Sequence, residues 1–208
     1  MMMNSSAQAK RTCPKKTDQD PSAARPHAAI DKPLLLLHVC CGPCATHVID
    51  RVRDTYHPVG FFYNPNLYPK QEYHRRLEAA ARVARRSAVA LWVPPFKEED
   101  WLDTVKGLET EPEGGRRCEV CIQHRLEMTA WMAQAASADA FATTLSLGPM
   151  KKSYVINKIG TELSKSYRCR FLAADFKKEN GFLKSVQMSK EMGLYRQNYC
   201  GCRYSMRR

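Results

Sequence analysis

The segment LLLLHVCCGPC, residues 34–44, combines the two features that organise this chain. Its uninterrupted apolar run, residues 34–39, predicts a β-strand that is covered on both faces. Three cysteines occur at and just after its end, and residues 44–54 predict a helix. A strand that leads through a short loop into a helix is the first unit of an α/β fold. The cysteines would then lie at the carboxyl end of the strand, where such folds bind ligands.

The same alternation of strand and helix continues along most of the chain. Further strands are predicted at residues 57–63, 89–93, 139–145 and 168–174, and further helices at 70–87, 97–108, 118–137, 154–166 and 182–194. Residues 195–208 show no clear pattern. Strands alternating with helices predict βαβ units with right-handed crossovers. We therefore expect a three-layer Rossmann-like fold of the nucleotide-hydrolase kind, with a mostly parallel sheet and a metal site at its carboxyl edge.

Length and composition set the limits of this domain. Of the 208 residues, 33–208 are expected to form a single α/β catalytic domain. Residues 1–32 are polar and aperiodic, which predicts a disordered N-terminal tail with Cys13 as a bystander thiol. No apolar run resembles a secretory signal or is long enough to cross a bilayer. We therefore expect a cytoplasmic protein that does not contact a membrane.

Seven of the nine cysteines fall into three short groups, which are Cys40, Cys41 and Cys44, then Cys118 and Cys121, then Cys200 and Cys202. Short spacers let neighbouring thiolates reach one metal centre, and thiolates are favoured ligands of iron–sulfur clusters and zinc. A cytosolic setting keeps thiols reduced, which favours metal binding over disulfides. Seven sulfurs exceed one four-cysteine site, so we expect a cluster with an additional feature beside it. Cys169, alone in a predicted strand, is expected to be a buried core cysteine.

The formal net charge of +12 indicates a polyanionic partner. Seven acidic residues are concentrated in residues 98–113, so the rest of the chain is more basic than the total suggests. Nucleic acid is the default partner of such a surface. The alternative is that the charge serves solubility alone.

Several other polar residues follow predicted strands and would share the carboxyl edge. Tyr63 lies in the sequence YNPN after the second strand, Lys151 follows the fourth, and Asp175 ends the fifth. The alternatives are a simple turn at YNPN and a solvated lysine. His38, inside the first strand, is expected to be a core histidine. The other histidines considered, His47, His57, His74 and His124, are expected at the surface or its boundary.

Six blocks of sequence resemble one known family. They are HVCCGPC (38–44), FFYNPN with EYHRRL (61–66, 72–77), CEVCIQHRLE (118–127), FATTLSLGPMKKS with INKIG (141–153, 156–160), AADFKKENGF (173–182) and YRQNYCGC (195–202). In this order they resemble the epoxyqueuosine reductases of the QueH type, over roughly Leu34 to Ser205. Gly148 departs from the family pattern, where a serine is expected before the proline. This departure weakens any role for a hydroxyl there and leaves the cysteines untouched.

The resemblance implies an oxidoreductase that removes the epoxide oxygen of epoxyqueuosine at the wobble position of tRNA, the last step of queuosine biosynthesis. It also implies a [4Fe-4S] cluster and an additional mononuclear iron, with neither cobalamin nor flavin. The implied partners are tRNAs with GUN anticodons, which decode tyrosine, histidine, asparagine and aspartate codons. Reduced ferredoxin or flavodoxin is the implied electron donor.

With this resemblance, roles can be assigned to residues as hypotheses. Cys41, Cys118, Cys121 and Cys200 would hold the cluster, and Cys40, Cys44 and Cys202 the extra iron, with other permutations left open. Tyr63, Asp175 and Lys151 are the candidate proton donors. Two alternatives remain. An iron–sulfur-dependent tRNA sulfur-transfer enzyme would need an SGGxDS-like ATP loop, which the sequence lacks. A zinc-stabilised RNA-binding module would need no catalysis.

Overall fold

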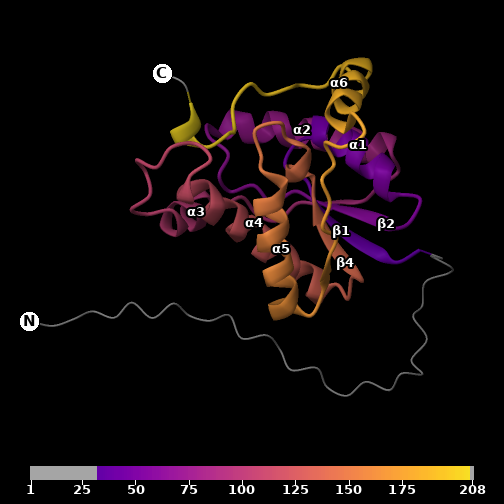
Figure 1. Ribbon diagram of the computed structural model, residues 1–208. Coiled ribbons are helices and arrows are strands. Elements are labelled where there is room, and N and C mark those ends of the chain that lie inside the picture. Colours follow the sequence, from indigo (N-terminus) through magenta and orange to yellow (C-terminus); the bar gives the residue numbers. More distant parts are fainter. Residues whose placement is uncertain (1–31, 207–208) are drawn as a thin grey trace, which may run out of the picture. The chain divides into compact units, whose positions relative to one another are not determined.

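The computed structural model describes residues 32–206, which contain a five-stranded sheet (Figure 1). Its strands are β1 (Leu34–His38), β2 (His57–Phe61), β3 (Leu91–Trp92), β4 (Ala140–Thr143) and β5 (Arg170–Phe171). They pair in the order β3-β2-β1-β4-β5, and every pair is parallel. This confirms the predicted fold class. The strand order reverses between β1 and β4, so ligands are expected at the carboxyl ends of these two strands.

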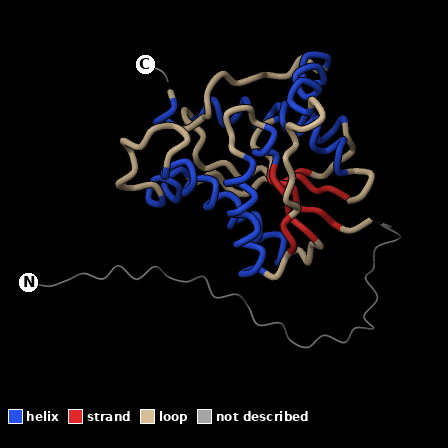
Figure 2. The backbone as a smooth tube through the Cα atoms, viewed as in Figure 1, coloured by secondary structure: helices blue, strands red, loops and turns tan. Residues whose placement is uncertain are grey.

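Helices cover both faces of the sheet (Figures 1 and 2). One face carries α1 (Gly42–Val52), α2 (Lys70–Arg86) and α6 (Gly181–Glu191), and the other carries α4 (Arg116–Ala135) and α5 (Ser153–Tyr167). A shorter helix, α3 (Glu98–Thr104), packs on α4. Strand β1 is apolar along its length because Leu35 and Leu37 join the core under α1 while Leu36 joins the core under α4.

Some predicted elements are shorter than their sequence patterns suggested. The apolar run at 139–145 leaves the sheet after β4 and continues as a 3-10 helix, η1 (Thr144–Leu147). The cause is local, because the Thr143 hydroxyl oxygen accepts the backbone N–H of Leu145 at 3.1 Å. Strands β3 and β5 have two residues each because each lies at an edge and pairs with one neighbour only. Residues 195–202 are irregular and lead into a second 3-10 helix, η2 (Arg203–Ser205).

Helix α1 packs closely against α2 and α6, just after the first cysteines. A Cβ atom at Gly42 would lie 2.5 Å from the carbonyl carbon of Ala79 on α2, so glycine is required at this position. His47 was predicted to lie at the surface or its boundary, and the structure places it in the interior instead. This residue of α1 is 3% exposed, because α6 begins directly against its ring at Gly181. The loop that carries the first cysteine group is therefore fixed by two helices.

Most of the predicted N-terminal tail, including Cys13, lies outside the described residues. The proposed extent of the catalytic domain, 33–208, stays a prediction. No helix in the described part of the chain is long and apolar enough to cross a membrane.

Candidate metal centre

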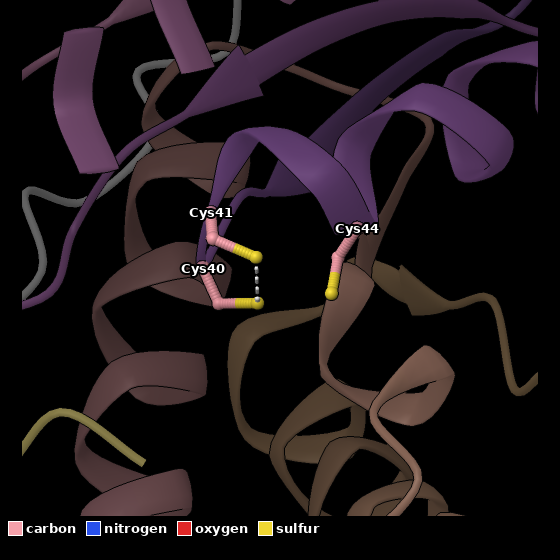
Figure 3. Close-up of side chains that lie close together, drawn as sticks. All are labelled: Cys40, Cys41 and Cys44. Carbon is pink, nitrogen blue, oxygen red and sulfur yellow. Dashed lines mark hydrogen bonds between the residues drawn. The ribbon is translucent and has the colours of Figure 1, made fainter. Parts of the chain in front are cut away.

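The first cysteine group lies where β1 passes into α1 (Figure 3). The sulfurs of Cys40, Cys41 and Cys44 all lie within 4.8 Å of one another, and those of Cys40 and Cys41 are 3.8 Å apart. Cys44 is in the first turn of α1, as predicted. Three sulfurs converging at this spacing can share one metal ion.

Contacts within this group shift the pKa values of its three thiols in opposite directions. The pKa of Cys41 lies well below its ordinary value because the thiols of Cys40 and Cys44 donate hydrogen bonds to it. The pKa of Cys44 is raised well above the ordinary value by its contacts with Cys40 and Cys41 and by burial, and that of Cys40 is also raised. Without a metal, negative charge in this group is therefore favoured on Cys41 over Cys40 and Cys44. A bound cation would release the remaining protons.

A threonine that directly follows the neighbouring strand β4 holds this group in place. The Cys40 backbone N–H donates to the Thr144 hydroxyl oxygen at 3.0 Å, and the hydroxyl donates to the Cys40 sulfur at 3.2 Å. Because Thr144 follows β4, the two contacts span the point where the strand order reverses. Nothing in the sequence pattern singled out Thr144, since the contact joins residues 104 positions apart.

The other four clustered cysteines share one pocket. Cys118 and Cys121 lie at the start of α4 on one face, as predicted, and Cys200 and Cys202 come from the C-terminal segment. The pocket is lined by Trp101, Arg117, Cys118, Cys121, Ile122, Arg125, Lys151, Cys200 and Cys202. All eight cysteines in the described range are free of disulfides. Arg125 interacts electrostatically with cysteines of all three groups, which are Cys40, then Cys118 and Cys121, then Cys200.

Two cations face these sulfurs, the buried Arg125 and the half-buried Lys151. Arg125 is 4% exposed and has no carboxylate partner among the described residues. Burial opposes its charge, yet nearby thiolates, chiefly those of Cys121 and Cys200, raise its pKa. The Lys151 ammonium donates to the Cys200 sulfur at 3.1 Å. The site is therefore built to hold negative charge on sulfur.

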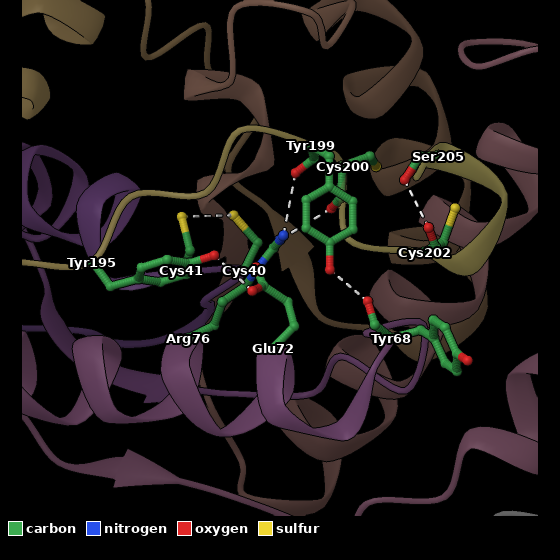
Figure 4. Close-up of polar contacts among 10 residues, drawn as sticks. All are labelled: Cys40, Cys41, Tyr68, Glu72, Arg76, Tyr195, Tyr199, Cys200, Cys202 and Ser205. Carbon is green, nitrogen blue, oxygen red and sulfur yellow. Dashed lines mark hydrogen bonds and ion pairs between the residues drawn. The ribbon is translucent and has the colours of Figure 1, made fainter. Parts of the chain in front are cut away.

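The C-terminal segment is held by a buried ion pair on α2 (Figure 4). The Arg76 guanidinium lies 2.7 Å from the Glu72 carboxylate, and both side chains are almost fully buried. Arg76 also donates to the carbonyl oxygens of Cys200 at 3.0 Å and Tyr199 at 3.2 Å. The Tyr195 hydroxyl donates to the other oxygen of Glu72 at 2.6 Å. This set of contacts, which we call the α2 clamp (Glu72, Arg76, Tyr195 and Tyr199), positions the last two cysteines.

The three candidate proton donors occupy different places. Lys151 lines the four-cysteine pocket. Tyr63 is buried, and its hydroxyl lies 2.9 Å from Nε2 of His124 on α4. Asp175 is linked to the pocket only through Lys177, whose ammonium is 3.7 Å from the Asp175 carboxylate and donates to the Lys151 carbonyl at 2.7 Å. Burial opposes the charge of Asp175, but hydrogen bonds from Ser153 and from the Lys177 backbone N–H leave its pKa lowered.

Two residues predicted to be structural have that role. His38 is fully buried, with Nδ1 2.9 Å from the Thr143 hydroxyl oxygen and Nε2 3.1 Å from the Tyr63 carbonyl oxygen. Cys169 is buried away from the three groups, and its thiol donates to the Ala138 carbonyl at 3.4 Å. The residues that sequence reasoning missed are Arg125, Trp101, Thr144 and the α2 clamp. Only Arg125 had a local signal, since it follows Cys121 by four residues on one helix face.

Fold and site together define a Rossmann-like α/β protein with a cysteine-lined metal centre at the carboxyl edge of its sheet. Two solved structures share the fold. One is a predicted subunit of tRNA methyltransferase from Methanocaldococcus jannaschii, with a TM-score of 0.50 and 12% identity over 76% of this chain and 88% of that one. The other is the U34-tRNA thiolase NcsA from Methanococcus maripaludis with its [4Fe-4S] cluster, with a TM-score of 0.55 and 13% identity over 84% and 61%.

Sequence comparison is more specific. Residues 35–208 match the model of the family described as epoxyqueuosine reductase QueH. The QueH protein of Streptococcus pyogenes is 41% identical over 84% of this chain and 71% of its own length, and that of Thermotoga maritima is 38% identical over 83% and 90%. This chain belongs to the QueH family of epoxyqueuosine reductases. The predicted family and oxidoreductase activity are confirmed, and the sulfur-transfer and zinc-module alternatives are not favoured.

Proposed function

We propose that this chain removes the epoxide oxygen of epoxyqueuosine in tRNA and so produces queuosine. The carrying observation is that the first cysteine group forms one close cluster and the other two groups, far apart in sequence, share one pocket, all within the region that matches the family. The reaction takes up two electrons and two protons. Both carbon–oxygen bonds of the epoxide break, an alkene forms, and the oxygen leaves as water.

An iron–sulfur cofactor fits the residues of this site. Its thiolate-bound form is anionic, and the pocket offers the cations Arg125 and Lys151 as compensating charge. Hydrogen-bond donors already contact two of the sulfurs before any cofactor is bound. The Gly114 backbone N–H donates to the Cys118 sulfur at 3.2 Å, and the Lys151 ammonium donates to the Cys200 sulfur. When bound, a [4Fe-4S] cluster would supply electrons singly and a neighbouring iron would supply a Lewis acid.

The fourth ligand of the cluster separates two assignments. Both place Cys118, Cys121 and Cys200 at the cluster. The assignment from sequence adds Cys41 and leaves Cys40, Cys44 and Cys202 for the extra iron. The shared pocket supports adding Cys202 instead, which leaves Cys40, Cys41 and Cys44 together as the second centre.

Paired single variants decide between these assignments. If Cys202 is the fourth ligand, Cys202→Ala loses the [4Fe-4S] signal in the visible and electron paramagnetic resonance spectra, while Cys41→Ala keeps it and loses about one iron per chain. The reverse pattern supports the assignment from sequence. Iron content and spectra of the anaerobically reconstituted variants give the answer, with Cys169→Ala as the matched control.

Lys151 is the proposed proton donor to the leaving oxygen. It is the one of the three predicted candidates that lines the pocket of cysteines. Asp175, whose pKa is lowered, is better suited to orient Lys177 than to give up a proton. Tyr63, with its hydroxyl bonded to His124, is better placed to position α4.

The segment around Lys151 also offers a surface for RNA. Met150 is 82% exposed and Tyr154 is 69% exposed, while Lys151 between them reaches into the pocket. Lys152 and Lys158 are exposed and form no ion pair with any described residue. We assign this surface (Met150, Lys152, Tyr154 and Lys158) to the anticodon loop of tRNAs with GUN anticodons, since unstacked bases pack on aromatic rings and phosphates on lysines. Reduced ferredoxin or flavodoxin is the proposed electron source.

Complementation tests the proposed function. In a bacterium that lacks its own epoxyqueuosine reductase, expression of this chain should convert the epoxyqueuosine of its tRNA to queuosine, as measured by mass spectrometry of digested tRNA. Cys118→Ala should leave epoxyqueuosine in place, and Cys169→Ala should behave as wild type. Conversion by Cys118→Ala at the wild-type level would show that the reaction does not depend on this site.

A further inference from the structure

Trp101 is a buried tryptophan whose ring nitrogen has no normal hydrogen-bond partner. It lies on α3, is 0% exposed and packs in one cluster with Val105, Cys121 and Cys202. It also lines the pocket of four cysteines. Within the described range, its Nε1 is one of a few buried polar side-chain atoms without a partner.

An unpaired buried N–H is uncommon in folded proteins, because leaving it without an acceptor costs free energy. The indole nitrogen can only donate, and water does not reach it here. The other two tryptophans, Trp92 and Trp131, are more than a third exposed, so water can accept hydrogen bonds from their indole N–H groups. The acceptors that share the pocket with Trp101 are sulfurs. Trp101 packs in the same buried cluster as Cys121 and lines the same pocket, so the Cys121 sulfur is an acceptor beside the indole.

We propose that the Trp101 indole N–H donates to the Cys121 sulfur of the iron-loaded centre and raises its reduction potential. The inference rests on the proposed function, because it needs a redox-active cluster in this pocket. A reduced cluster carries one more negative charge, which is spread over its sulfurs. A donor held against one of these sulfurs stabilises the reduced form more than the oxidised form. Trp101 is therefore a residue that sets the potential through Cys121, without touching the substrate.

The test replaces the N–H and keeps the shape. The isostere 3-benzothienylalanine, in which sulfur replaces the indole N–H, is introduced at position 101 alongside Trp101→Phe. Midpoint potentials are measured by redox titration of the anaerobically reconstituted proteins, with the spectrum of the reduced cluster as readout. Both replacements should shift the midpoint potential to a more negative value while iron content stays unchanged.

Two controls separate the hydrogen bond from packing and from tryptophan loss in general. Val105→Ala removes a neighbour from the same buried cluster without removing a donor, and Trp131→Phe removes an exposed tryptophan. Both should keep the wild-type potential. Loss of the cluster in the isostere would overturn the inference, because the N–H would then be needed for cluster binding rather than for the potential. Equal potentials for wild type and isostere would overturn the inference while leaving the proposed function standing, whereas a wild-type protein that binds no cluster would overturn both.

Discussion

At the scale of single residues, the site is defined as much by its cations as by its sulfurs. A buried guanidinium normally has a carboxylate nearby, because an uncompensated charge is costly in the protein interior. Arg125 has thiolates in that place, and Lys151 contacts a cysteine sulfur directly. These two side chains make a strongly anionic metal centre compatible with the interior of this fold.

Cys169, the one described cysteine outside the three groups, provides an internal contrast. Burial raises the pKa of Cys169 to about 11. Because the thiolate is the reactive form, only about one molecule in a thousand is reactive at pH 8, against a large minority for a free cysteine. Iodoacetamide at pH 8 should therefore modify Cys169 at least about 100-fold more slowly in the native protein than in urea, as followed by peptide mass spectrometry. Labelling should accelerate as the pH approaches 11, and equal rates in native and unfolded protein would contradict the assigned core role.

At the scale of elements, each cysteine group depends on a different contact between segments. The first is fixed by α1 packing on α2 at Gly42 and by Thr144 after β4. The last is held by the α2 clamp, and Gly201, with a φ of +110°, lets the chain turn between Cys200 and Cys202. A Cβ atom at Gly201 would also clash with the Arg76 guanidinium. The α2 clamp therefore requires glycine at this turn.

Breaking the α2 clamp on one side should release the C-terminal cysteines. Arg76→Gln leaves the Glu72 carboxylate buried without its partner, which should cost about 3–5 kcal/mol in the free energy of unfolding. The Cys200 and Tyr199 carbonyls also lose their donor, so iron content should fall. Urea unfolding of the metal-free protein and iron analysis measure the two effects.

A second variant makes this prediction specific to the buried charge. Glu72→Gln combined with Arg76→Gln removes both charges and should be less destabilised than Arg76→Gln alone. Arg85→Gln, at an exposed position of the same helix, should change neither unfolding nor iron content. If the single and double variants lost equal stability, the ion pair would not be the stabilising feature.

Sequence reasoning was most accurate for features that are local. The run LLLLHV identified a strand buried on both faces, and the spacing of Cys118 and Cys121 placed them correctly on one helix face. Residues whose role depends on distant partners were missed, such as Arg76, which meets the Cys200 carbonyl across 124 positions. His47 was misjudged for the same reason, because its burial comes from α6. The residue types were visible in each case, but the partners were supplied only by the fold.

At the scale of the whole molecule, we expect the net charge and the surface beside the metal pocket to contribute together to tRNA binding. We expect the net charge of +12 to attract tRNA from a distance, while Lys151, in the segment from Met150 to Tyr154, lines the metal pocket. Lys190, near the C-terminal end of α6, is exposed and does not line the metal pocket. Charges there should matter less for specific contact.

Salt dependence should distinguish the two kinds of contact on the RNA surface. Replacing both Lys152 and Lys158 with Gln should weaken binding of an anticodon stem-loop and lower the slope of log affinity against log salt by roughly 1–2. Tyr154→Ala should weaken binding by about 1–3 kcal/mol with the slope unchanged, because stacking carries no counterions. Fluorescence anisotropy across a salt series measures both. Lys190→Gln, near the end of α6, is the control, and an equal effect there would argue against a localised surface.

The central claim is that the seven clustered cysteines hold the iron that reduces the epoxide. The most direct test is a single-turnover reaction in which an excess of iron-loaded protein, with a chemical reductant in excess to supply both electrons, meets epoxyqueuosine-containing tRNA without cobalamin or flavin, followed by mass spectrometry of the released nucleosides. We predict the loss of one oxygen atom from the modified nucleoside, yielding queuosine, with wild type and Cys169→Ala but not with Cys118→Ala or iron-free protein. Equal conversion by the iron-free protein, or none by an iron-loaded wild type that binds the tRNA, would contradict the account.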